Sequence, residues 1–166
     1  MPRNPIETLL DRLQETHEVY RRLLTIAEEK KTHILRNDLN SLRVDIEAEE
    51  TLSRRGADLN ALCDELRGEC LRALGRQDGA GTLEDLTRLM PADLRQPLEE
   101  ERGGLKDTLH KLRDRNRMNM SLVNSSLDLM EGLLAVMFGT ETVSTYGRRG
   151  RRTRSGPPAR ALNARV

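Results

Sequence analysis

The chain has 166 residues, of which 33% are charged, 36% are hydrophobic and only 2% are aromatic. This length allows one domain with a modest core, but a compact globule ordinarily fills its core with large rings. A chain rich in Leu, Glu, Arg and Ala and nearly free of rings is typical of long helices packed side by side. The net charge of +1 divides into +6 for residues 139–166 and −5 for residues 1–138.

The first two predicted helices form an antiparallel pair. Apolar side chains recur every seven residues from about residue 6 to residue 36, which predicts one long helix. Asn37 can close that helix in the left-handed conformation, and Asp38 is a good N-cap for a second helix over residues 38–75. A connection this short forces the two helices antiparallel. Gly56, inside the second helix, either admits a neighbouring helix closely or is simply tolerated.

A glycine-rich loop over residues 75–81 ends the second helix. Thr82 followed by Asp85 resembles a capping box and predicts a short helix over residues 83–90. A third long helix then runs over residues 91–138, with its proline at position 91 suited to the first turn.

The third long helix contains two weak points, Pro97 and the Gly103–Gly104 pair, so we expect its first quarter to kink or fray. The predicted fold is therefore all-α: an antiparallel bundle of three long helices plus one short helix over residues 1–138. Residues 139–166 lack apolar periodicity and are rich in Gly, Pro, Ser, Thr and Arg, which predicts a flexible basic tail.

The two halves of the third helix differ in the width of their apolar face. In the first half the leucines occupy an arc of only about 60°, typical of a helix with one neighbour. Asn116 and Asn119 continue this seam, and we predict that they fix the register between helices. In residues 118–138, 13 of 21 residues are apolar. They fill an arc of roughly 200°, about twice what a bundle helix needs.

The surplus apolar face is the best candidate for a functional surface. No further helix remains in the sequence to cover it, which leaves self-association or a partner protein. Four of the six methionines lie in residues 118–138, and flexible thioethers favour a partner because they adapt to imperfectly matched surfaces. The predicted binding face consists of Leu122, Val123, Leu127, Met130, Leu133, Leu134, Met137 and Phe138.

The sequence offers no catalytic or metal-binding pattern. The three histidines have no cysteine or carboxylate at ligand spacing, and His17 is interpreted as a partly buried core residue. We therefore predict a protein that is not an enzyme and uses no cofactor or metal. Cys63 and Cys70 would lie about 10.5 Å apart on one helix, too far for a disulfide, which favours reduced thiols in the cytoplasm.

Secretion, membrane insertion and nucleic-acid binding are all disfavoured. No N-terminal signal peptide is visible, and the polar and acidic residues within residues 118–138 argue against stable membrane insertion. The Arg-rich tail could neutralise phosphates, but the body is acidic and carries no nucleic-acid-binding element. We therefore predict no nucleic-acid partner.

The order of these features resembles the FlgN family of flagellar export chaperones over about residues 6–150. The resemblance rests on the Asn-Asp-Leu corner at residues 37–39, the acids Glu47, Glu49 and Glu50, and two motifs near the C-terminus. These motifs read Leu109-x-x-Leu112-x-x-x-Asn116-x-x-Asn119-x-x-Leu122 and Thr145-Tyr146-Gly147-x-x-Gly150.

The resemblance implies a cytosolic chaperone that binds hook–filament junction (hook-associated) proteins before secretion and keeps them unassembled. It implies that the surplus apolar face receives a C-terminal helical segment of such a client. It also implies that Tyr146, with Gly147, contacts the large membrane subunit of the export gate. The alternative that remains open is a self-associating coiled-coil scaffold, or a homodimer in the free state, that uses the same face.

Overall fold

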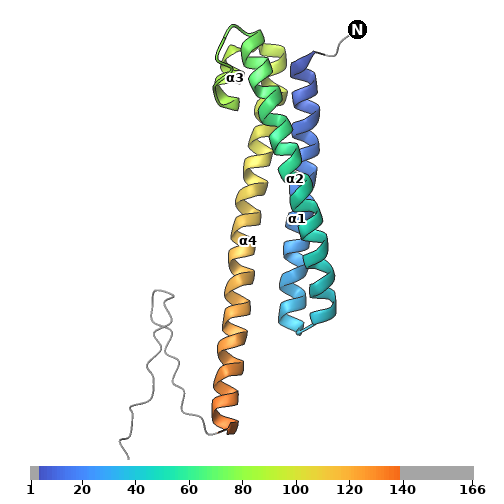
Figure 1. Ribbon diagram of the computed structural model, residues 1–166, viewed down its shortest axis with the longest axis vertical. Coiled ribbons are helices and arrows are strands. Elements are labelled where there is room, and N and C mark those ends of the chain that lie inside the picture. The colour runs from blue at the N-terminus through green and yellow to red at the C-terminus, as the bar shows by residue number, and fades with distance from the viewer. Residues whose placement is uncertain (1–3, 139–166) are drawn as a thin grey trace, which may run out of the picture. The chain divides into compact units, whose positions relative to one another are not determined.

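The computed structural model describes residues 4–138, and these residues form four helices without any strand. Figure 1 shows α1 and α2 side by side, with α3 at the end of this pair where the chain begins. The all-α prediction of three long helices plus one short helix is confirmed. The helices are α1 (Pro5–Arg36), α2 (Leu39–Ala73), α3 (Leu83–Leu89) and α4 (Ala92–Phe138).

The corner between α1 and α2 has the predicted chemistry. Asn37 adopts the left-handed conformation, with φ of 54°, and its backbone N–H donates to the carbonyls of His33 and Ile34. Asp38 caps α2 by accepting a hydrogen bond of 3.1 Å from the backbone N–H of Ser41. A second bond from the Ser41 hydroxyl is the main reason why the pKa of Asp38 is lowered.

The predicted capping box of α3 is also present. The Thr82 hydroxyl oxygen accepts from the backbone N–H of Asp85 at 3.1 Å, and the Asp85 carboxylate accepts from the backbone N–H of Thr82 at 2.8 Å. The hydrogen bonds that the Asp85 carboxylate accepts, first from the backbone N–H of Thr82 and then from its hydroxyl, lower the pKa of Asp85. At the other end of α3, the Arg95 guanidinium donates to the carbonyls of Thr87 and Met90, which satisfies acceptors that the helix leaves open.

The first quarter of α4 does not fray, since the helix is continuous across Pro97 and the Gly103–Gly104 pair. Tertiary contacts hold this segment in place. Leu98 is only 1% exposed, and Glu101 pairs with a buried histidine of α1. Packing therefore overrides the low helix propensity of Pro and Gly here.

The core of the first part of the chain consists of two clusters. Gly56 lies next to Val19 and Tyr20, and a Cβ built on it would lie 3.6–3.7 Å from their side chains, an ordinary van der Waals contact, so the packing of α1 and α2 does not require a glycine there. The larger cluster comprises Leu9, Leu13, Cys63, Cys70, Leu71, Leu86, Met90 and Leu98; the smaller one comprises Val19, Leu23 and Leu59.

The two cysteines are buried and free, as predicted from their spacing. Burial raises the pKa of both thiols, that of Cys70 to about 11. Both thiols therefore stay protonated at neutral pH and serve as small apolar groups in the core.

The chain divides into two compact units, Met1–Ser125 and Ser126–Val166, and the division falls inside α4. In the second unit the structure describes only residues 126–138. The predicted basic tail, residues 139–166, lies outside the described residues.

Candidate docking surface on α4

Within the first unit, a buried histidine joins α4 to α1. The Nδ1 atom of His17 lies 2.5 Å from the Glu101 carboxylate, and its Nε2 atom lies 2.9 Å from the Thr108 hydroxyl. The side chain of His17 is only 6% exposed to solvent, and both ring nitrogens have hydrogen-bond partners, as buried polar groups require. His17 is therefore a core residue, as the sequence indicated, and its two partners were not foreseen.

Gly104 completes this contact. A Cβ built on Gly104 would lie 2.7 Å from the Cε1 atom of His17, closer than real Cβ contacts. The neighbouring Gly103 has nothing within 4 Å of the same virtual atom. One glycine of the pair therefore admits the imidazole ring, whereas the other has no packing role. The sequence signal for this contact was the position of His17 on the apolar row of α1, together with a glycine in α4 at a position where other residues would form a helix more readily.

The two asparagines of the predicted seam have different environments. Asn119 is 4% exposed and its amide donates to the backbone carbonyl of Ala27 at 2.7 Å. Asn116 is exposed, so the structure brings only one of the pair to a helix interface. Beside them, Arg115 donates to Glu28 at 3.3 Å. These contacts continue the pairing of α4 with α1 beyond His17.

In the second unit, residues 126–138 expose nearly all of their large apolar side chains. Val136 is 82% exposed and Met137 is 74% exposed. On the helix, the predicted binding residues occupy one broad side, with Glu131 at its edge next to Phe138 and Asp128 on the opposite side. We call the following exposed set the apolar end: Leu127, Met130, Leu133, Leu134, Met137 and Phe138.

The remaining predicted site residues fall elsewhere. Leu122 and Val123 are half-buried in the first unit. Tyr146 and Gly147 lie outside the described residues. Met118, Met120 and Leu129 are exposed apolar side chains that the predicted face did not include, although the sequence analysis had counted them in the wide arc.

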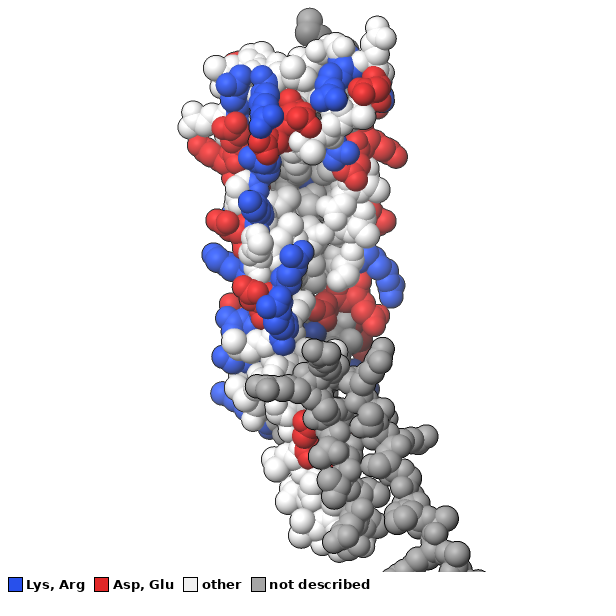
Figure 2. Space-filling view, turned by 90° about the vertical axis from the view of Figure 1, so that its left-hand side faces the viewer, with Lys and Arg blue, Asp and Glu red and all other residues white. Residues whose placement is uncertain are grey.

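Where it is visible in Figure 2, the end of α4 is a surface of mostly uncharged side chains. Across residues 4–138 no group of three or more His, Cys, Asp or Glu is arranged to hold a metal ion. By length and hydropathy alone, α4 also has a stretch that could cross a membrane, with a mean hydropathy of 1.2.

The family comparison gives this surface a context. The model of the FlgN protein family matches residues 1–154, which is most of the chain. The chain belongs to the FlgN family. FlgN proteins are flagellar export chaperones that work in the cytoplasm, and the family is one of chaperones, not of enzymes. The match includes the Tyr-Gly motif at residues 146–147. Searches of curated proteins and of solved structures find no match to this FlgN protein.

Proposed function

We propose that this FlgN protein binds the C-terminal helical region of hook-associated junction proteins through the apolar end of α4. The observation that carries the proposal is the exposure of six large apolar side chains on one side of residues 126–138. A soluble protein rarely exposes so many neighbouring apolar groups unless a partner covers them. An amphipathic client helix laid along them would bury its own apolar face in the same step.

The chemistry of the surface suits a chaperone that must release its client. Met130 and Met137 have flexible thioether side chains, which adapt to clients of different shape. A client segment that is unfolded before binding loses conformational entropy when it docks, so part of the contact energy is spent on ordering it. The resulting affinity is moderate, and the client stays unassembled in the cytoplasm until export.

The test replaces Leu127, Met130 and Leu134 with Asp. We expect the triple variant to remain folded and to lose binding of the junction protein in a pull-down. The matched control places the same three charges on the opposite side of α4, at the exposed positions Ser121, Ser125 and Gly132. Unchanged binding by the folded triple variant, or equal loss in the control, contradicts the assigned surface.

Delivery to the export gate is the second part of the proposal, and it rests on the family resemblance at Tyr146 and Gly147. The tyrosine is the only aromatic residue after Phe138. We expect Tyr146→Ala to retain client binding and to lose binding to the large membrane subunit of the gate, measured with purified proteins. Gate binding that survives this substitution would refute the assignment of Tyr146.

Self-association through the apolar end is the competing function, favoured by the same exposed side chains. Light scattering of the purified protein with and without client separates the two. If the protein is a chaperone that forms a homodimer in the free state, that homodimer dissociates when the client is added. A dimer that persists at saturating client identifies the protein as a coiled-coil scaffold instead.

A further inference from the structure

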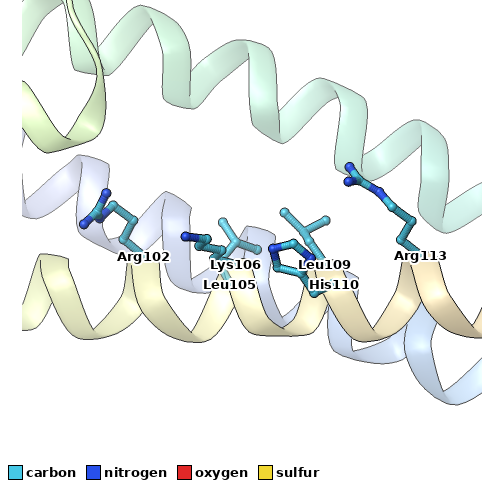
Figure 3. Close-up of a pocket in the computed structure, with 6 residues that line it drawn as sticks. All are labelled: Arg102, Leu105, Lys106, Leu109, His110 and Arg113. Atoms are coloured by element: carbon cyan, nitrogen blue, oxygen red, sulfur yellow. The ribbon is translucent and has the colours of Figure 1, made fainter.

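A second candidate interaction surface lies in the first unit, on the side of α4 that faces α2. A groove of about 300 Å³ is lined by Arg102, Leu105, Lys106, Leu109, His110 and Arg113. Figure 3 shows these six side chains projecting from α4 on one side, toward the ribbon of α2. Two of the lining residues are leucines and the other four are basic, without an acidic residue among them.

The basic residues of this groove differ from most cations of the bundle surface. Elsewhere arginine commonly has a carboxylate one turn away on its own helix, as in the pairs Arg22–Glu18, Arg54–Glu50, Arg67–Asp64 and Arg88–Glu84. In the part of the chain that the structure describes, no ion pair is found for Lys106, His110 or Arg113. Arg102 has one partner, Glu84 at 3.5 Å, which it shares with Arg88.

This arrangement is unfavourable for the isolated protein. Arg102 and Lys106 are four residues apart, the spacing at which like charges on a helix repel. Leu109 is 36% exposed at the surface of the groove. A partner that carries both negative charge and apolar side chains relieves both costs at once.

We propose that this basic groove binds an acidic amphipathic helix of a partner protein. The lining residues span twelve positions of α4, about 16 Å along its axis, which matches roughly three turns of a second helix. Leucines of that helix fill the groove over Leu105 and Leu109, and its carboxylates pair with Lys106 and Arg113. The protein's own C-terminal segment does not fit, because residues 139–166 carry seven Arg and one acid.

The groove is independent of the apolar end in position and in chemistry. It lies within Met1–Ser125, whereas the apolar end begins at Leu127. The apolar end has no basic residue between positions 126 and 138. A client and an acidic partner can therefore be tested separately on the full-length protein.

The test measures binding of a synthetic peptide of about 14 residues, four helical turns, with Leu on one side and Glu on the others. The matched control peptide has the same composition in scrambled order. We expect the full-length protein to prefer the amphipathic peptide, and Lys106→Glu/Arg113→Glu to weaken its binding by about tenfold. The control variant Arg21→Glu/Lys111→Glu has the same net charge and alters exposed residues outside the groove. We expect it to stay close to wild type.

Several results overturn the proposal. Absence of peptide binding would show that the groove does not bind such a helix. Equal binding of the scrambled peptide, or equal weakening by both double variants, would show that any attraction depends on overall charge and not on the groove. Displacement of the peptide by duplex DNA would identify a general polyanion surface. A homodimer that Lys106→Glu/Arg113→Glu dissociates would identify a second copy of this chain as the occupant.

Discussion

The two parts of α4 have the same secondary structure and opposite environments. In the first unit the helix contacts α1 through Leu98, through the buried His17 and through Asn119. In residues 126–138 its large apolar side chains are each at least half exposed. Hydrophobicity alone therefore does not decide burial in this protein. The more polar part of the helix is packed, and the more apolar part is left exposed.

The difference teaches where stability and function lie. The packed part depends on specific fits, such as the imidazole of His17 over Gly104 and the amide of Asn119 on a backbone carbonyl. Among the described residues, the apolar end makes no such specific contacts. Binding there depends on the apolar surface area that a partner covers, which suits a surface that must accept a client segment. Substitutions in the packed part should therefore change stability, whereas those in the apolar end should change binding.

The largest expected effect separates a buried leucine from an exposed one on the same helix. Leu98→Ala leaves a cavity in the larger core cluster and should lower the free energy of unfolding by about 2–5 kcal/mol. Leu133→Ala should change it by less than about 0.5 kcal/mol, because Leu133 is 55% exposed. Urea denaturation measures both. Similar losses for the two variants would show that the apolar end is part of the core.

The glycine pair provides a finer test of the packed part. Gly104→Ala should destabilise the protein by about 1–3 kcal/mol, because the new methyl group collides with the ring of His17. Gly103→Ala should stabilise it by up to about 1 kcal/mol, since its Cβ meets open space and Ala is the better helix former. Thermal unfolding of the two variants checks the opposite signs. Stabilisation by both would mean that His17 does not pack against α4 as described.

The smallest expected effect concerns pH and belongs to the capping box of α3, outside α4. The pKa of Asp85 is lowered from 3.8 by hydrogen bonds from Thr82. A carboxylate with a lowered folded-state pKa stabilises the protein above its unfolded value and loses that contribution as the pH falls through the folded value. The stability advantage of wild type over Asp85→Asn should therefore shrink below about pH 4. An advantage that is independent of pH would exclude this role of the capping box.

Much of the fold was predictable because its signals are local. The Asn37–Asp38 corner and the Thr82–Asp85 capping box involve residues close in sequence, and both are present. The single long helix over residues 91–138 was predicted and is present, but the expected fraying near Pro97 and the glycines is absent, because that expectation rested on propensity alone. Leu98 and Glu101 hold this segment through contacts with residues more than eighty positions away or on other helices.

The candidate site was predictable only where its signal is local to one helix. The widening of the apolar arc is a property of one helix, so the sequence located the exposed residues from Leu127 onward. Asn116 and Asn119 could not be separated without the position of α1, which decides that only Asn119 reaches a backbone carbonyl. The basic groove was missed because it depends on which side of α4 faces α2.

Hydrogen–deuterium exchange of the full-length protein tests the central claim most directly. The measurement compares amide exchange along α4 with and without the C-terminal helical segment of a hook–filament junction protein. We predict that the client slows exchange in residues 127–138 and leaves residues 92–118 nearly unchanged, because only the former offer an exposed apolar side. Protection confined to residues 92–118, or unchanged exchange in residues 127–138 at saturating client, would contradict the account.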